Sequence, residues 1–370
     1  MCIILSSFKN YYFSLLDFDF NIFYGVLESL YFYISLLYNM EFSDLDADAR
    51  IQSTNDEALS SKWSAVQAGY FDDPFIKYMI KDKIKIKKSP IINRGTYIRT
   101  MVIDKFIHSF LQFVNPLEKK QIISFGAGSD TRYFNIMSTL GKSVNFIFHE
   151  LDFSAVTQHK VSIISKTQVL LDIIKSSCDS PDDLEINLHS GTILSPSYCI
   201  HPIDLRTLTS IPLPSKIDGN LPTLILSECC LVYLEPQEAD QLVQWSVNTF
   251  SSKGLGIVIY EPIKNFDLFG KMMVKNLASR GISFKTLDKY STTEKQSIRL
   301  FDLGFTGYQN AVTIKQIYDE WFDHYDKMRI SKVELLDEIE EWDLLASHYC
   351  VAWGWKDEHE NGYFKEWCKF

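Results

Sequence analysis

Short apolar runs alternate along the chain with segments whose apolar residues recur at helical spacing. The runs predict parallel strands over residues 121–125, 144–148, 198–203, 223–227 and 255–260. Segments 152–167 and 235–250 have the pattern of helices between strands. Such alternation is typical of an α/β fold with a doubly wound sheet and helices on both faces. A last apolar run, residues 348–355, predicts a strand at the edge of this sheet.

Four more helices flank the predicted strands, two before the first and two after the fifth. They are expected over residues 58–80, 97–114, 266–280 and 313–325. The acidic segment 41–56 is expected to be loose, and the Ser-, Pro- and Gly-rich segment 186–220 to form loops around one strand. We therefore divide the chain into a leader, an acidic N-terminus with a helical cap, and a core with inserted lid helices. These domains comprise residues 1–39, 40–115 and 116–370.

The leader, residues 1–39, differs in composition from the rest of the chain. It is rich in Phe, Tyr, Ile and Leu, and residues 20–39 approach the length of a membrane span. No basic residues flank this segment, and Glu28 would lie near its middle, which is costly in a bilayer. Met40 precedes a polar, acidic sequence typical of a cytosolic N-terminus. Our hypothesis is that translation starts at Met40; a membrane anchor is the alternative.

A glycine motif follows the first predicted strand, in the sequence Ile122-Ile-Ser-Phe-Gly-Ala-Gly-Ser-Asp-Thr-Arg132. Gly126 and Gly128 allow a sharp turn and a close approach of the backbone to a ligand. Ser129 or Asp130 is expected to cap a helix over residues 133–140, which ends at Gly141. The next strand ends about 25 residues later in the carboxylates of His149-Glu-Leu-Asp-Phe153, a spacing close to that of nucleotide-binding βαβ units. The two segments together predict a site for a nucleoside-bearing cofactor.

The residues after Gly128 indicate which cofactor fits. A dinucleotide fingerprint has a third glycine where this chain has Thr131, and Asp130 would repel a pyrophosphate. A ligand with a ribose but no phosphate, such as S-adenosylmethionine, suits this loop better.

Further polar residues follow the predicted strands, where ligands of open α/β sheets bind. Asp152, Asp204, Glu228 and Glu261 end successive strands, so a common site is expected at that edge of the sheet. Arg94 and Arg99 precede a long apolar helix. A guanidinium group is the natural partner of a carboxylate-bearing ligand, although either arginine could also be a surface residue.

The charge and the cysteines narrow the class of protein. A net charge of −10 disfavours general nucleic-acid binding. The seven cysteines include no C-x-x-C pair, which favours reduced thiols and a cytoplasmic protein, with the nucleus as a second location left open. The chain lacks the H-E-x-x-H, P-loop and G-x-S-x-G motifs, and no metal site is expected. The one dense basic run spans Lys81–Lys88.

Taken together, these motifs resemble the leucine carboxyl methyltransferases, which methylate the C-terminal leucine of the type 2A protein phosphatase catalytic subunit. The resemblance extends from about residue 62 almost to the C-terminus. Its matching segments are residues 92–99, 125–131, 150–153, 203–206, 226–233 and 348–350. It implies a seven-stranded Rossmann-like sheet that uses S-adenosylmethionine and yields S-adenosylhomocysteine, with a helical cap. Cys230 departs from the pattern, since a bulkier aliphatic residue is common there.

The resemblance also implies roles for individual residues. Gly126 and Gly128 would lie against the cofactor, Asp152 rather than Glu150 would bind the ribose, and Lys62 would add a contact from the cap. At the two ends of the ligand, the expected contacts are Asp204 and Leu205 to the adenine, Arg99 to the methionine carboxylate and Glu228 to its amino group.

The absence of acid–base motifs is consistent with this chemistry. A terminal carboxylate has a pKa of about 3.5 and is ionised at pH 7, so it needs no general base. The enzyme has to align the reacting atoms and exclude water. Our hypothesis is that Tyr233 and a cap arginine, Arg99, orient the substrate carboxylate. Lys81–Lys88 could steer the phosphatase towards an otherwise acidic enzyme.

Three alternatives remain open. They are a related carboxyl methyltransferase acting on a modified tRNA base, a small-molecule O-methyltransferase, and a non-catalytic or membrane-tethered scaffold. The acidic charge disfavours tRNA, and the intact motif residues disfavour loss of the cofactor. We expect a monomer that binds neither nucleic acid nor a membrane.

Overall fold

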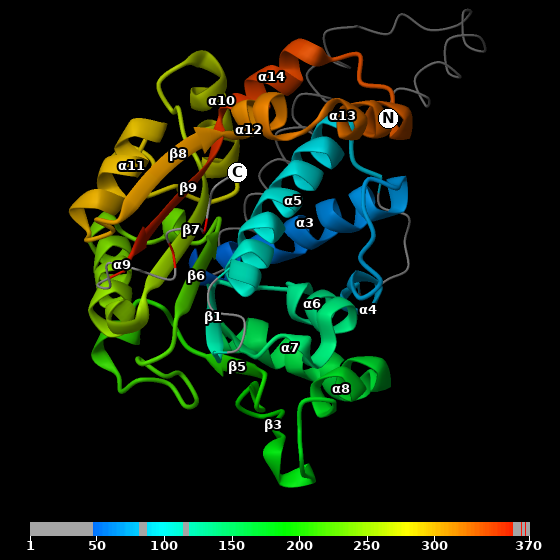
Figure 1. Ribbon diagram of the computed structural model, residues 1–370. Helices are drawn as coiled ribbons and strands as arrows, with labels where there is room; N and C mark the ends of the chain where they lie inside the picture. Colours follow the sequence, from blue (N-terminus) through cyan, green and yellow to red (C-terminus); the bar gives the residue numbers. More distant parts are fainter. Residues whose placement is uncertain (1–46, 81–86, 114–117, 358–363, 365–366, 368–370) are drawn as a thin grey trace, which may run out of the picture. The chain divides into compact units, whose positions relative to one another are not determined.

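The computed structural model describes residues 47–80, 87–113 and 118–357, together with Phe364 and Trp367 (Figure 1). The chain divides into two units, residues 1–50 and 51–370, and only residues 47–50 of the first unit are described. The leader and residues 81–86 of the basic run lie outside the described residues, so the hypotheses about them stay predictions. Within the described ranges, no helix has the length and apolar character of a membrane span.

A mixed sheet of nine strands forms the centre of the second unit, in the order β3-β4-β5-β2-β1-β6-β7-β9-β8. The strands are β1 (Lys120–Phe125), β2 (Phe146–Asp152), β3 (Glu185–Asn187), β4 (Thr192–Leu194), β5 (Tyr198–Pro202), β6 (Thr223–Glu228), β7 (Leu255–Pro262), β8 (Tyr308–Thr313) and β9 (Tyr349–Lys356). The five central strands, β5-β2-β1-β6-β7, run parallel. The prediction of a doubly wound α/β sheet is confirmed, with nine strands in the described residues rather than seven.

Two features of the sheet differ from the prediction. β9 lies between β7 and β8 and pairs antiparallel with both, so it is not the edge strand. The edge strand β8 is partly exposed along most of its length and has the polar sequence Tyr-Gln-Asn-Ala-Val-Thr, which gives little strand signal. At the other edge, β3 and β4 are three-residue strands within a segment predicted to be loops, and most of their residues are not buried.

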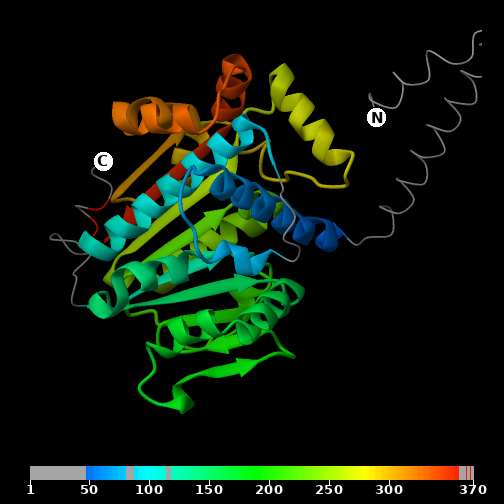
Figure 2. The same ribbon diagram turned by 90° about the vertical axis from the view of Figure 1, so that its right-hand side faces the viewer.

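Helices cover both faces of the sheet (Figures 1 and 2). The α-helices are α3 (Ala47–Ala68), α4 (Ile76–Met79), α5 (Pro90–Phe113), α6 (Arg132–Leu140), α7 (Ser154–Lys166), α8 (Gln168–Lys175), α9 (Pro236–Phe250), α10 (Leu268–Ala278), α11 (Thr293–Asp302), α12 (Ile314–Trp321), α13 (His324–Val333) and α14 (Ile339–Ser347). Short 3-10 turns are η1 (Gly141–Ser143), η2 (Pro181–Asp183), η3 (Leu208–Ser210), η4 (Leu231–Tyr233) and η5 (Ser251–Lys253).

Two helices begin earlier than predicted. α3 starts at Ala47, within the acidic segment that we expected to be loose. α5 starts at Pro90 rather than at residue 97, so Arg94 as well as Arg99 lies inside this helix. Proline is favoured in the first turn of a helix because that position needs no N–H donor.

Two apolar clusters lie on opposite faces of the sheet because successive side chains of a strand alternate. Ile122 and Leu224 pack in the cluster that includes residues of α5, α6, α7 and α14. Their neighbours Ile123 and Ile225 pack against α9 and α11 on the other face. These clusters hold the central strands in register, and the register fixes the residues at the strand ends.

Candidate active site

The site lies at the carboxyl ends of the central strands, where parallel neighbours bring their following residues together. Phe125, the last residue of β1, is in register with Leu151 of β2 and Ser227 of β6. The glycine motif therefore starts between Asp152 and Glu228. β5 lies beside β2, and Asp204 lies two residues past the end of β5.

The glycine loop is bonded to Asp152. Gly126 and Gly128 have φ of 62° and 52°, a region that favours glycine. The Gly128 N–H donates to Asp152 Oδ2 at 2.7 Å, and the Phe153 N–H donates to Oδ1 at 2.7 Å. A Cβ at Gly126 would lie 2.7 Å from the Cys230 sulfur, so this position has no room for a side chain. Burial raises the pKa of Asp152, and the two backbone donors oppose that rise.

Helix α6 starts directly after this loop and is anchored from the cap. Thr131 is the residue before its first turn, where we had predicted Ser129 or Asp130. Asp130 still accepts a hydrogen bond from the Arg132 N–H at 3.0 Å. Lys62 of α3 donates to Thr131 Oγ1 at 2.9 Å and pairs with Asp73 at 2.8 Å. Lys62 therefore contacts the site from the cap, and its ammonium group forms an ion pair with Asp73.

Glu228 lies between two arginines at the end of β6. The Arg99 Nε of α5 donates to one carboxylate oxygen, and Arg132 Nη1 donates to the other at 2.7 Å. The Arg99 guanidinium also lies over the Tyr260 ring, 4.7 Å from its centroid. Burial acts to raise the pKa of Glu228, but Arg132 and Arg99 hold it below its ordinary value. The side chain is therefore a carboxylate over a wide pH range.

Arg132 was not assigned a role from the sequence. Besides Glu228, it contacts Asp104 at 2.7 Å and Asp130 at 3.0 Å, and it is 6% exposed. A cation in the first turn of a helix is unfavourable next to the helix dipole unless carboxylates surround it. An arginine directly after the glycine motif could therefore have indicated a carboxylate cluster.

Asp204 and Leu205 lie next to the end of β5. Arg206 binds both oxygens of Asp204, at 2.9 and 3.0 Å from its Nε. Burial acts to raise the pKa of Asp204, but Arg206 holds it below the ordinary value. Leu205 is 8% exposed and packs in the cluster beneath α9. These two residues lie at the end of β5, beside the strand that carries Asp152, and their contact with the adenine stays a prediction.

Two residues that we expected near this site have other surroundings. Glu261 is buried with its carboxylate 3.6 Å from Arg299 Nη1 of α11, so the common site predicted at the strand ends does not include its side chain. Arg94 packs against Tyr318 and Trp342 instead of joining Arg99. Arg94 and Arg99 are five positions apart on one helix, which turns their side chains to different sides.

Tyr233 closes η4, directly after the Cys229–Cys230 pair. Its ring lies 5.7 Å from the Phe284 ring. Burial raises the pKa of its hydroxyl, and the nearby Cys229 adds to the rise. The hydroxyl is therefore a hydrogen-bond donor at neutral pH.

One buried group in the described residues has metal-ligand character. His149, Cys199 and His201 bring three donor atoms within 4.8 Å on β2 and β5. The histidine rings stack at 5.3 Å and share a hydrogen bond of 3.1 Å. Burial lowers the pKa of His201 to about 4, so the pair is neutral. The contact leaves His149 Nε2 buried without a hydrogen-bond partner among the described residues.

Comparison with known proteins agrees with the geometry. A family model described as leucine carboxyl methyltransferase matches residues 50–247. Leucine carboxyl methyltransferase 1 of Aspergillus fumigatus is 42% identical over 83% of this chain and 83% of its own. The Schizosaccharomyces pombe protein of that name is 42% identical, covering 82% and 93%, and an Arabidopsis thaliana homolog is 36% identical, covering 84% and 90%.

Among solved structures, the plantazolicin methyltransferase BpumL is similar over 83% of this chain and 99% of its own, at 14% identity and a TM-score of 0.39. That likeness is too distant to bear on function. The family model and the close relatives confirm the resemblance seen in the motifs and show that the chain is a methyltransferase. This chain belongs to the leucine carboxyl methyltransferase family.

Proposed function

We propose that this enzyme transfers a methyl group from S-adenosylmethionine to the α-carboxylate of the C-terminal leucine of the type 2A protein phosphatase catalytic subunit. The observation that carries the proposal is the placement of Glu228 between Arg99 and Arg132, beside the glycine loop. An anion flanked by cations suits the amino acid end of the ligand, which carries both charges.

The described residues fit S-adenosylmethionine. The amino group would bind Glu228, and the carboxylate would bind the Arg99 Nη atoms, since the Arg99 Nε already donates to Glu228. Asp152 uses one lone pair of each oxygen for the loop, and the remaining lone pairs can accept the ribose hydroxyls. Gly126 and Gly128 expose the backbone between the amino acid end of the ligand and its ribose. Asp204 and Leu205 would border the adenine. Lys62 would reach the ligand from the cap.

The reaction needs positioning more than proton transfer. S-adenosylmethionine supplies an activated methyl group when bound. The leucine carboxylate is ionised at pH 7, so this chain provides no general base. Arg99 and the protonated Tyr233 would orient the carboxylate by donating hydrogen bonds. The buried surroundings of Tyr233 and Tyr260 would exclude water from the reacting oxygen.

The relatives share the name leucine carboxyl methyltransferase. That name describes those proteins, and it supports leucine as the acceptor in this proposal. The experiment is methyl transfer from labelled S-adenosylmethionine to the phosphatase catalytic subunit, either intact or without its terminal leucine. We expect label in the intact subunit and none in the shortened one. Equal labelling of both would contradict the leucine as acceptor while leaving the cofactor assignment intact.

A further inference from the structure

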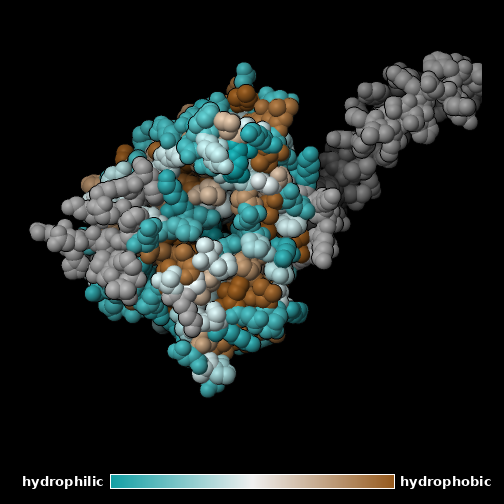
Figure 3. Space-filling model, turned by 45° about the vertical axis from the view of Figure 1, so that its right-hand side comes forward, coloured by the Kyte–Doolittle hydropathy of each residue, from teal (hydrophilic) through white to brown (hydrophobic). Residues whose placement is uncertain are grey.

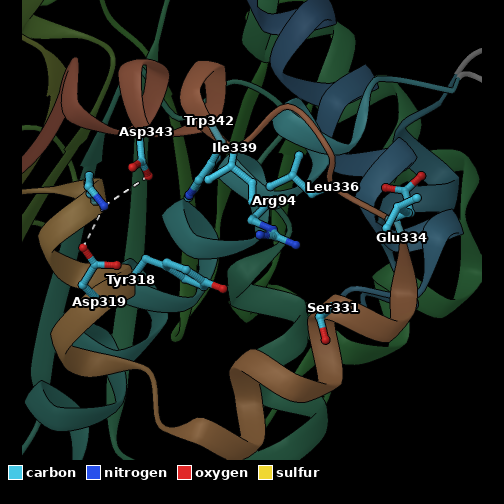
Figure 4. A pocket seen from close by; sticks show the side chains of 11 residues that line it. Arg94, Tyr318, Asp319, Ser331, Glu334, Leu336, Ile339, Trp342 and Asp343 are labelled. Atoms are coloured by element: carbon cyan, nitrogen blue, oxygen red, sulfur yellow. Dashed lines mark hydrogen bonds and ion pairs between the residues drawn. The ribbon is translucent and has the colours of Figure 1, made fainter.

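A second pocket lies on the other side of α5, between that helix, α12, α13 and α14. Its volume is about 400 Å³, within the range of small-molecule sites. Figure 4 shows the Arg94 guanidinium in the middle of the surrounding side chains, with Tyr318 and Trp342 on one side and Glu334 on the other. None of the residues that we assign to the cofactor lines it.

Arg94 is the unusual group in this pocket. It is 7% exposed, and its Nε has no hydrogen-bond partner in the structure. Among the described residues, no carboxylate lies within 4 Å of it in an ion pair, although its guanidinium lies 5.7 Å from the Tyr318 ring centroid and 5.8 Å from that of Trp342. A buried charge without a carboxylate is costly, and a bound anion would remove that cost.

The acidic residues of the pocket have partners of their own. Lys315 pairs with Asp319 at 3.0 Å and with Asp343 at 3.1 Å, as the dashed lines in Figure 4 show. Glu334 accepts a hydrogen bond from Asn93 Nδ2 at 2.8 Å. The Tyr70 hydroxyl interacts with both Glu334 and Arg94, and Asn93 Oδ1 is buried without a hydrogen-bond partner. Arg94 Nε and Asn93 Oδ1 are therefore the unsatisfied atoms of these two neighbouring residues.

Apart from Ser331, the rest of the wall is apolar, and it is open to the outside. Trp342 and Leu336 line it, and Leu335 and Ile339 are 80% and 60% exposed at its rim. Apolar and polar side chains form small separate patches over the face in Figure 3, so exposure of single apolar side chains does not by itself mark a binding surface. A ligand here would meet a guanidinium at the bottom and apolar side chains around it.

We propose that this pocket binds a carboxylate carried on an apolar or aromatic group. The planar guanidinium can donate hydrogen bonds to both oxygens of a carboxylate, and Trp342, Leu336 and Ile339 would contact the apolar part. The site is distinct from the cofactor site, so it does not depend on the proposed function. The carboxylate belongs either to a free small acid or to an acidic segment of a protein.

The test uses the full chain saturated with S-adenosylhomocysteine, so that Arg99 is occupied. Phenylacetate and its neutral analogue phenylacetamide are titrated and followed by calorimetry or NMR. We expect phenylacetate to bind about tenfold or more tightly than the amide. Arg94→Gln should abolish this preference, while Lys332→Gln, which removes an exposed cation of α13, should retain it.

The variant Ile339→Glu gives a second, independent test that leaves Arg94 in place. A carboxylate at the exposed rim should repel phenylacetate and leave the binding of the amide nearly unchanged. Equal affinities for acid and amide, no binding at about 10 mM, or a preference that survives both Arg94→Gln and Ile339→Glu would overturn the proposal. A peptide with aspartate beside phenylalanine distinguishes the sources: displacement of phenylacetate assigns the site to a protein segment, and no displacement assigns it to free acids.

Discussion

At the scale of residues, Asp152 holds the glycine loop with the same carboxylate that we assign to the ribose. Asp152→Ala removes the acceptor of the Gly128 and Phe153 N–H groups and the acceptor of the hydroxyls. We expect the affinity for S-adenosylmethionine to fall by about 30-fold, or about 2 kcal/mol, in calorimetry. Asp172→Ala on α8, where the side chain is exposed, is the matched control. Unchanged affinity in Asp152→Ala would rule out the assignment.

Glu150 gives a prediction of pH dependence. Burial raises its pKa to about 7 from an ordinary value of 4.5, in spite of Lys160, whose Nζ lies 2.5 Å away. A raised pKa means that the folded state binds the proton more tightly, so this stabilisation is complete below about pH 4.5 and is lost as the pH rises through 7. We therefore expect the unfolding free energy of the native protein, relative to Glu150→Gln, to fall from pH 5 to pH 8.

Denaturant unfolding at the two pH values measures this difference. Glu185→Gln, at an exposed position of β3, is the control and should show no such trend. A relative stability that rose with pH would mean that the pair with Lys160 outweighs burial.

Some residues of the site could be predicted from the sequence, and others could not. Gly126, Asp152 and Glu228 each follow a strong apolar run, so their place at one edge of the sheet follows from the fold. Arg132 could not be assigned because its three carboxylates come from α5, the glycine loop and β6, which only tertiary packing brings together. Arg94 and Arg99 could not be separated until α5 was known to contain both.

At the scale of elements, Asp73 connects the cap to the core. One of its oxygens accepts the Phe75 and Ile76 N–H groups at the start of α4, and the other contacts Lys62 and Thr131. Asp73→Ala would leave Lys62 without its carboxylate and α4 without its N-terminal acceptor. We expect the unfolding free energy to fall by about 3 kcal/mol in denaturant titration. Asp72→Ala, one residue away and exposed, should change it little, and equal effects would contradict this role.

The predicted strands were reliable where both faces are buried. β1, β6 and β7 are buried along nearly their whole length, and each contains a short apolar run. β8 has a mixed polar sequence, so its pairing with β9 rests on neighbours that the sequence does not reveal. For the same reason β9 was expected at the edge, although its buried residues fit the interior position between β7 and β8.

At the scale of the whole molecule, a net charge of −10 has to be reconciled with an anionic substrate. Arg99 and Arg132 face three carboxylates, those of Asp104, Asp130 and Glu228, so the arginines of the site do not by themselves reverse the field. The basic run at Lys81–Lys88 remains our hypothesis for steering the phosphatase. Substrate recognition would then combine weak long-range attraction with a short-range site for one carboxylate.

The most direct test of the central claim is mass spectrometry of the phosphatase catalytic subunit after reaction with S-adenosylmethionine and this enzyme. The account predicts one methyl ester, on the α-carboxylate of the C-terminal leucine, that mild alkali removes. Glu228→Gln, which loses the carboxylate held by Arg99 and Arg132, should slow its formation strongly. A methyl group on any other residue, or no transfer by an enzyme that binds S-adenosylmethionine, would contradict the account.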